Sequence, residues 1–308
     1  VSLLMLASTV ERGVPGLSNA APVEARQEDH FFRIQAKQSR SIRAGSMNWQ
    51  VAANSSDLVF EHPVSGVSQL KVHAIDGEMN VLKAVGQWVS STQIGVERSR
   101  AIGLSDDRRL LAHQTISRIS KTLDVRVGAT GSLRRTSNQD RERSTAALRP
   151  HVSVSFSPPL KRKVQFFWKI AGIYRDPTLN ELFWIPGGNP LLRSESGLTT
   201  DLTASFALRL RSVVHQARAT MYHHVLREQI VWRPQFIATG LQVWTPENMG
   251  AVVGQGIELS HSLSANKMRA RLSMSWMRSQ DRTDPSSRSF GKQLRYHPQR
   301  LLRGSINR

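Results

Sequence analysis

The sequence predicts an all-β protein built from antiparallel strands, and three observations point to this fold class. Apolar and polar residues alternate with a period of two over most of the chain, as in residues 202–210 (LTASFALRL). Because successive side chains of a strand face opposite sides, this alternation gives each strand one apolar and one polar face. Turn-forming residues separate the alternating segments at the spacing of consecutive hairpins. No segment shows a helical period over a convincing length.

In chain order, the predicted strands all share this alternation. They cover residues 32–37, 47–51, 70–74, 123–128, 152–157, 164–170, 202–210 and 271–276. Turns are predicted at residues 54–57, 76–77, 105–107 and 158–159, and longer polar insertions at residues 134–143 and 279–288. Residues 108–120 are the one segment in which a helix competes with a strand. Residues 1–7 are apolar but lack the flanking features of a signal peptide, so a strand or loop is favoured there.

Alternation alone leaves two architectures open. A soluble sandwich buries its apolar faces, whereas a transmembrane barrel turns them to lipid and its polar faces to a wet lumen. Three observations raise the barrel to equal standing with the soluble domain, and both architectures stay open on this pattern alone. Strands and loops fill the 308 residues without a domain boundary, and two sets of residues fit a barrel. Long cations recur on the polar faces, at Arg33, Lys37, Lys71, Arg126, Lys169, Arg209 and Arg271. Tryptophans lie near strand ends, where an aromatic girdle forms, at Trp88, Trp184, Trp232 and Trp244.

The chain is strongly basic, with 42 Lys+Arg against 23 Asp+Glu and a net charge of +19. A nucleic-acid binder usually gathers such charge on one helix or stripe beside aromatic platforms. Here the arginines are spread over nearly every predicted strand, so we expect no nucleic-acid partner. The same charge suits contact with anionic ligands and with the phosphates of lipopolysaccharide.

Site chemistry is limited by what the sequence lacks. Without cysteine, it has no disulfide framework, thiolate zinc site or cysteine nucleophile. The adjacent His223 and His224 would face opposite sides of a strand, and no carboxylate cluster accompanies them, so we expect no metal site. Phosphate-binding glycine loops and serine-nucleophile motifs are missing. We therefore predict no catalytic residue, no cofactor and no enzyme activity.

Residues 168–195 (WKIAGIYRDPTLNELFWIPGGNPLLRSE) carry the most specific pattern in the chain. An aromatic-Arg-x-Pro-Thr segment leads to Leu-x-Glu-Leu and then to Gly-Asn-Pro-x-Leu-x-x-Glu. This pattern resembles the barrel of TonB-dependent outer-membrane receptors. The matching residues are Tyr174, Arg175, Pro177, Thr178, Leu179, Asn180, Glu181, Leu182, Gly188, Asn189, Pro190, Leu192 and Glu195. Residues 230–234 and 244–248 resemble the hairpin loop that follows, and residues 256–259 the strand start after it.

The resemblance implies an antiparallel transmembrane β-barrel in the bacterial outer membrane. The family barrel has more strands than this chain supplies, so residues 1–308 are expected to form an incomplete part of a large barrel, without a plug domain. The implied function is energy-coupled uptake of a scarce metal chelate, such as a ferric siderophore or cobalamin, with the TonB energising complex acting through the plug. The motif residues are expected to be architectural: Pro177 suits a strand end, Gly188–Pro190 suits a turn, and Arg175 can pair with Glu181.

Ligand contact is predicted at the loop that holds Trp232, Arg233, Trp244 and Asn248. Outer-membrane lipid and lipopolysaccharide are the other expected partners. The alternative function is that of a soluble β-rich binding module for a polyanionic ligand, which predicts solubility without detergent and salt-dependent binding.

Overall fold

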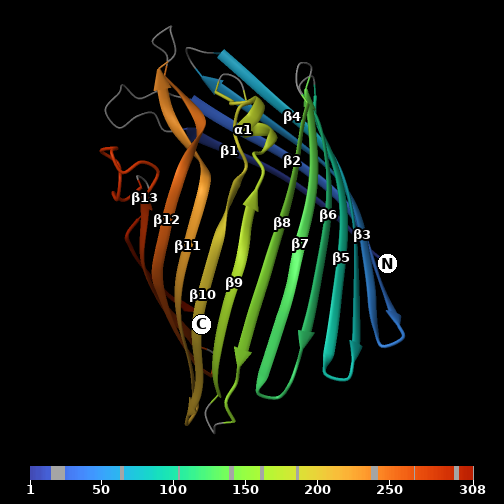
Figure 1. Cartoon of the computed structure of the whole chain (residues 1–308), viewed down its shortest axis with the longest axis vertical. Helices are drawn as coiled ribbons and strands as arrows, with labels where there is room; N and C mark the ends of the chain where they lie inside the picture. Colours follow the sequence, from blue (N-terminus) through green and yellow to red (C-terminus); the bar gives the residue numbers. More distant parts are fainter. Residues whose placement is uncertain are drawn as a thin grey trace.

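The structure is a computed structural model that describes residues 1–14, 25–62, 66–102, 105–138, 142–159, 163–184, 187–236, 242–266, 268–294 and 298–307. These residues form a sheet of 14 strands in which each strand pairs antiparallel with the next along the chain (Figure 1). The strands are β1 Ser2–Val14, β2 Ala25–Ile42, β3 Gly45–His62, β4 Gly66–Val85, β5 Trp88–Ala101, β6 Ser105–Arg118, β7 Leu123–Asn138, β8 Glu142–Phe156, β9 Lys163–Arg175, β10 Glu195–Leu210, β11 Val213–Phe236, β12 Gln242–Ala265, β13 Met268–Asp281 and β14 Arg300–Asn307. A short helix, α1 (Leu179–Phe183), lies between β9 and β10.

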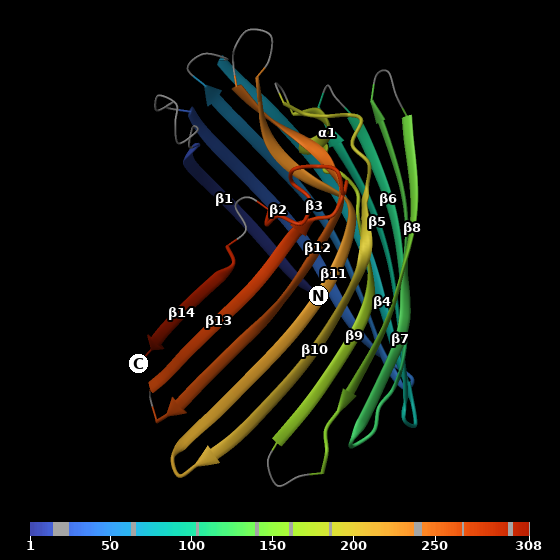
Figure 2. The ribbon, with the colours of Figure 1, turned by 60° about the vertical axis from the view of Figure 1, so that its left-hand side comes forward.

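The sheet curves strongly but does not close. Figure 2 shows a trough whose two edges, β1 and β14, stand apart. Among the described residues no ladder joins β1 to β14. This is the all-β, antiparallel, incomplete barrel that the sequence predicts. No helix in the described part of the chain is long and apolar enough to cross a membrane.

The two ends of the sheet differ in their connections. At one end, the turn end, two-residue turns join β2 to β3, β4 to β5 and β10 to β11. Ala44, Gly86 and Arg211 in these turns have φ of 61°, 59° and 52°, the left-handed backbone that tight hairpins require. The opposite end, the loop end, holds the two longest connections, residues 176–194 and 282–299. Outer-membrane barrels show this asymmetry, with short turns on the periplasmic side and long loops outside.

The convex face of the sheet is apolar. One row of register partners runs across six neighbouring strands and is made of Val154, Trp168, Leu202, Met221, Ile257 and Trp276. Leu202, Met221 and Trp276 are 49%, 55% and 61% exposed. Burying such a side chain away from water is worth about 1.5–3 kcal/mol of free energy, so this face needs lipid to cover it. A soluble sandwich would bury this row in its core, and the sandwich alternative is therefore wrong.

The concave face is polar. Arg33 of β2 pairs with Asp76 of β4 at 3.3 Å, and Gln35 donates to Gln50 at 2.8 Å. On β6, His113 hydrogen bonds to Thr130 of β7 at 2.7 Å. This face lines the trough, as expected for the wall of a wet lumen.

Three of the predicted turns are wrong. Residues 54–57 and 76–77 lie inside β3 and β4, and residues 105–107 begin β6. Their polar side chains are turn-like in composition, but in the structure they belong to long strands whose polar groups face the lumen or the loop end. The segment 108–120, in which a helix was the rival, lies largely in β6.

Two face assignments also differ from expectation. Near the loop end of β4 the buried Leu70 and Ala74 face inward, so Lys71 faces outward and not into the lumen. The cause is α1, because Leu70 forms a core cluster with Leu179. Trp184 is not part of an outer girdle: it follows α1 and packs edge-on against Phe60, with ring centroids 5.8 Å apart.

Candidate functional site

The described part of the connection between β9 and β10, residues 176–184 and 187–194, folds inward at the loop end, where Figures 1 and 2 show α1 against the inside of the sheet. Leu179 packs with Leu70 of β4 and Ala101 of β5. Leu182 packs with Leu192 and with Ile230 of β11. The connection therefore reaches strands on both sides of its origin between β9 and β10. We call residues 176–184 and 187–194, with the side chains that hold them, the loop cluster.

Arg175, the last residue of β9, anchors the loop cluster to two carboxylates. Its Nε and Nη2 donate to the two oxygens of Glu195 at 2.9 and 2.8 Å, a bidentate pair. Its Nη1 donates to both oxygens of Glu181 at 3.0 and 2.9 Å. Glu195 also accepts the backbone N–H of Ile230 at 2.7 Å. The expected pairing of Arg175 with Glu181 is thus one arm of a network that joins β9, α1, β10 and β11.

Helix α1 begins at a capping box. The Thr178 hydroxyl accepts the Glu181 N–H at 3.1 Å, and the Glu181 carboxylate accepts the Thr178 N–H at 2.8 Å. Pro177 precedes the cap, and its carbonyl accepts a hydrogen bond from Arg134 of β7 at 2.5 Å. Short helices are marginal alone, so this helix depends on its cap and on the contacts of Leu179 and Leu182.

A buried ion pair lies beneath the start of the helix. Arg134 Nε donates to Asp107 Oδ1 of β6 at 2.7 Å, and the two side chains are only 5% and 6% exposed. Thr136 donates to the same carboxylate oxygen at 2.6 Å. Since Arg134 also holds the Pro177 carbonyl, the pair fixes the loop cluster to the wall of the trough. Desolvated charges of this kind are stable only when they are fully paired.

Asp176 collects three hydroxyl donors. Tyr174 and Ser194 donate to its Oδ1 at 2.8 Å, and Thr145 of β8 donates at 3.1 Å. Burial by itself would raise the pKa of Asp176, but the hydrogen bonds from Ser194 and Tyr174, the charge of Arg134 and the Thr145 bond outweigh it. The pKa of this carboxyl is therefore held below its usual value.

Two asparagines fasten the second half of the loop cluster to the hairpin of β11 and β12. Asn189 donates to the Pro246 carbonyl at 3.0 Å and accepts the Leu191 N–H at 3.0 Å. Asn248 accepts the Arg193 N–H at 2.7 Å and donates to the carbonyls of Arg193 and Glu228 at 2.9 and 2.8 Å. Each side-chain amide thus hydrogen bonds to the backbone of two segments that are far apart in sequence and holds them together.

The residues predicted to contact ligand lie together in this hairpin. Trp232 of β11 is the register partner of Pro246, and Trp244 of β12 is the partner of Pro234. Arg233 is half exposed and lies 3.8 Å from Glu247. The fourth predicted residue, Asn248, is adjacent, but its amide is occupied by backbone groups.

Four residues of the cluster went unrecognised in the sequence: Asp107, Arg134, Thr145 and Asp176. Asp107 and Arg134 lie on adjacent strands and meet only through the strand register, which alternation does not supply. Asp176 lies inside the motif, between Arg175 and Pro177, so its place in the motif could have marked it as part of the cluster.

Metal-binding groups are missing from the described ranges, where no three His, Cys, Asp or Glu side chains gather. His223 is exposed, and His224, on the other face, stacks against Tyr222 with ring centroids 6.0 Å apart. The two histidines therefore do face opposite sides, as the sequence predicts.

Comparison with known families gives a direct match. The sequence model described as "TonB dependent receptor-like, beta-barrel" matches residues 115–305, which is more than half of the chain.

The chain belongs to the TonB-dependent receptor family.

Members of this family are receptors and transporters of the outer membrane, so the convex apolar face lies against that membrane. The chain is 27% identical over 124 residues to a protein named vitamin B12 transporter BtuB from Vibrio vulnificus. It is 25% identical over 109 residues to a protein of the same name from Photobacterium profundum. These matches cover 40% and 35% of the chain but only 19% and 17% of the two relatives.

Solved structures of TonB-dependent receptors share the fold. The FrpB iron transporter from Neisseria meningitidis (F5-1 variant) superposes with a TM-score of 0.72 at 12% identity, over 99% of this chain and 54% of that one. The copper transporter OprC superposes with a TM-score of 0.71 at 12% identity, over 92% of this chain and 50% of that one. The siderophore receptor PirA from Acinetobacter baumannii gives 0.60 at 13% identity, over 97% and 53%. The chain thus spans about half the length of these receptors.

Proposed function

We propose that the protein takes up a scarce metal chelate, of the ferric siderophore or cobalamin type, across the outer membrane, and that residues 1–308 form part of its barrel wall. The match of residues 115–305 to the receptor barrel family carries this proposal. The sequence relatives are named for vitamin B12 transport and the structural neighbours for iron, copper and siderophores. Cyanocobalamin is therefore the first ligand to test, followed by ferric siderophores.

The loop cluster supports a binding role at the outer surface. It lies at the loop end, which faces outside the cell in barrels of this asymmetry. We assign ligand contact to Trp232, Arg233 and Trp244, because two amphipathic rings and an exposed cation lie on one hairpin beside the cluster. Asn248 acts indirectly by holding that hairpin to residue 193. The motif residues from Tyr174 to Glu195 serve to fold the cluster.

Energy would come from the TonB complex through a plug domain, which residues 1–308 do not include. The protein would bind and move its ligand without covalent chemistry, so we assign it no enzyme activity and no cofactor.

Uptake in a strain that lacks the gene tests the proposal. We expect the complemented strain, but not the deletion strain, to accumulate labelled cyanocobalamin or a ferric siderophore, and a protonophore to abolish this uptake. Arg233→Gln should weaken ligand binding, while Arg211→Gln in the turn end should leave it unchanged. Equal uptake of every probe with and without the gene would refute the proposal.

A further inference from the structure

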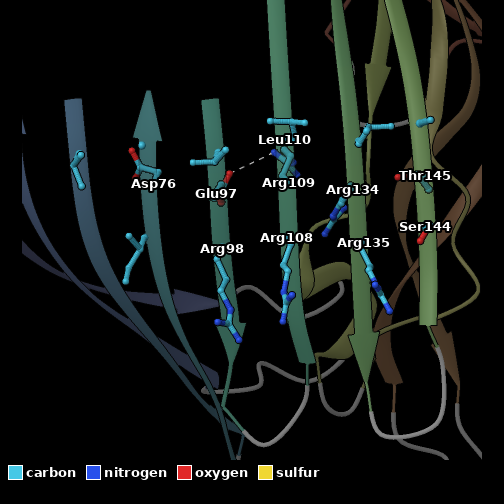
Figure 3. Close-up of a pocket in the computed structure, with 16 residues that line it drawn as sticks. Asp76, Glu97, Arg98, Arg108, Arg109, Leu110, Arg134, Arg135, Ser144 and Thr145 are labelled. Atoms are coloured by element: carbon cyan, nitrogen blue, oxygen red, sulfur yellow. Dashed lines mark ion pairs between the residues drawn. The ribbon is translucent and has the colours of Figure 1, made fainter. Parts of the chain in front are cut away.

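A row of arginines lies on the outward face of the barrel wall, away from the loop cluster. Arg98 of β5, Arg108 of β6 and Arg135 of β7 are register partners on three neighbouring strands. Figure 3 shows the three side chains at about the same level, close to the ends of three neighbouring strands. They are 60%, 62% and 62% exposed. We call these residues the arginine row.

An apolar surface lies next to the arginine row on the side away from the loop end. Its nearest members, Val96, Leu110 and Leu133, are again register partners on the same three strands, and all are exposed. The two rows together line a groove of about 900 Å³. The groove therefore has a cationic rim on the side of the loop end and an apolar floor on the side away from it.

Carboxylates organise the arginine row without neutralising it. Asp106 accepts hydrogen bonds from Arg98 at 2.8 and 3.1 Å and from Arg108 at 3.2 Å, so it holds these two guanidinium groups side by side. Arg135 pairs with Glu142 at 2.7 Å. Arg100, the register partner of Asp106, adds a fourth cation on the same face. Four guanidinium groups thus face two carboxylates, which leaves an excess of positive charge.

The position of the row determines what it can meet. Arginine on the lipid face of a barrel is unfavourable in the hydrocarbon and tolerated near the interface, so the row marks the level of the lipid head groups at the loop end. Guanidinium groups bind phosphate through two parallel hydrogen bonds, and side-by-side guanidiniums suit several phosphate oxygens. The apolar floor below suits acyl chains. A phosphorylated lipid presents both parts with this same spacing and polarity.

We propose that this groove binds lipopolysaccharide of the outer leaflet, with its lipid phosphates on Arg98, Arg108 and Arg135 and its acyl chains over Val96, Leu110 and Leu133. The proposal rests on the outer-membrane location of the family and not on which chelate is transported. A site for this lipid would fix the height and rotation of the barrel wall in its membrane.

Lipid retention by purified protein tests the site. The protein would be extracted from outer membranes in mild detergent, and lipopolysaccharide bound per protein would be measured beside the triple variant R98Q/R108Q/R135Q. A basic residue near an anionic membrane surface contributes about fivefold in affinity, so we expect binding of added lipopolysaccharide to weaken roughly 100-fold. The matched control R109Q/R126Q/K169Q removes three cations from the lumen face and should bind like wild type.

The possible outcomes separate the sources of phosphate. Equal lipid retention by wild type and the triple variant would overturn the proposal, as would equally tight binding of a dephosphorylated lipid with the same acyl chains. If inorganic phosphate displaced the lipid at similar concentrations, the apolar floor would play no part and the lipid assignment would fail. Should the triple variant not reach the outer membrane, the three single variants carry the test, each with an expected loss of about fivefold. Chelate uptake should persist in these variants, so failure here is distinct from failure of the proposed function.

Discussion

Replacing Arg175 with Met should loosen the loop cluster while leaving the barrel intact. The substitution keeps an unbranched apolar stem but removes the guanidinium group, so Glu181 and Glu195, which are 10% and 11% exposed, lose their shared cation. Breaking a buried ion pair by removing one partner costs about 3–5 kcal/mol, and the 38% exposure of Arg175 reduces this to about 2–3 kcal/mol. The cost falls on local opening, because the strands keep their own ladders.

Hydrogen exchange measured by mass spectrometry reports this opening. The amides of Leu182, Asn189 and Ile230 are protected by bonds to Thr178 O, Glu181 O and the Glu195 carboxylate, at 3.0, 2.8 and 2.7 Å. If the free energy of local opening falls by about 2–3 kcal/mol, peptides that contain these amides should exchange roughly 30- to 140-fold faster.

Arg193→Met is the matched control, since Arg193 lies in the same loop but makes a surface pair with Glu228 and is 71% exposed. A surface ion pair contributes at most about 1 kcal/mol to stability, so its loss should speed hydrogen exchange by about fivefold at most. If Arg175→Met changed exchange no more than Arg193→Met does, the reasoning that Arg175 anchors the cluster would be refuted.

Three further outcomes are expected. Arg134→Met should lower the free energy of opening the loop cluster by about 3–5 kcal/mol, more than Arg175→Met does, because Arg134 is nearly fully buried. An increase in hydrogen exchange no larger than that of Arg175→Met would contradict this ranking. The pKa of Asp176 is lowered in the folded protein, so its stabilising contribution is present above the usual aspartate pKa and is lost as pH falls through the lower folded value. Hydrogen exchange of the loop-cluster amides, corrected for intrinsic rates, should therefore accelerate below about pH 4 in wild type. The same exchange should depend less on pH in Asp176→Asn. Met221→Arg should lower the free energy of unfolding in lipid vesicles by about 2–4 kcal/mol near the bilayer midplane, whereas Thr220→Arg on the lumen side should have little effect, as urea titration would show.

The strands were predictable because a strand in a barrel wall has two distinct environments on its two faces. Leu202, Phe206 and Leu208 had to share one face once the period of residues 202–210 was known, whatever the tertiary details. The helix α1 was missed, because five residues are too few to show a helical period. Its capping box was present in the sequence at Thr178 and Glu181, inside the motif, and was a usable sign of a helix start.

The failures have a common physical cause, which is contact between residues that are distant in sequence. Asp76-Gly77 is a strong hairpin signal, yet Asp76 pairs with Arg33 in mid-sheet. Lys71 was placed in the lumen because its neighbours alternate with it, but the loop cluster covers Leu70 from inside and reverses the polarity there. The pairing of Asp107 with Arg134 requires the strand register. The motif residues could be located from sequence, whereas their partners on other strands could not.

Oxygen and water accessibility along β10 tests the central claim that this sheet is a wall between lipid and lumen. The chain has no cysteine, so single cysteine substitutions at residues 200–208 can each carry one spin label in the protein reconstituted into vesicles. We predict that collisions with oxygen, which concentrates in lipid, peak at even positions such as Leu202 and Phe206. Collisions with a water-soluble nickel chelate should peak at odd positions such as Thr203 and Ser205. Labels equally accessible to water on both faces, or no period of two, would contradict the account.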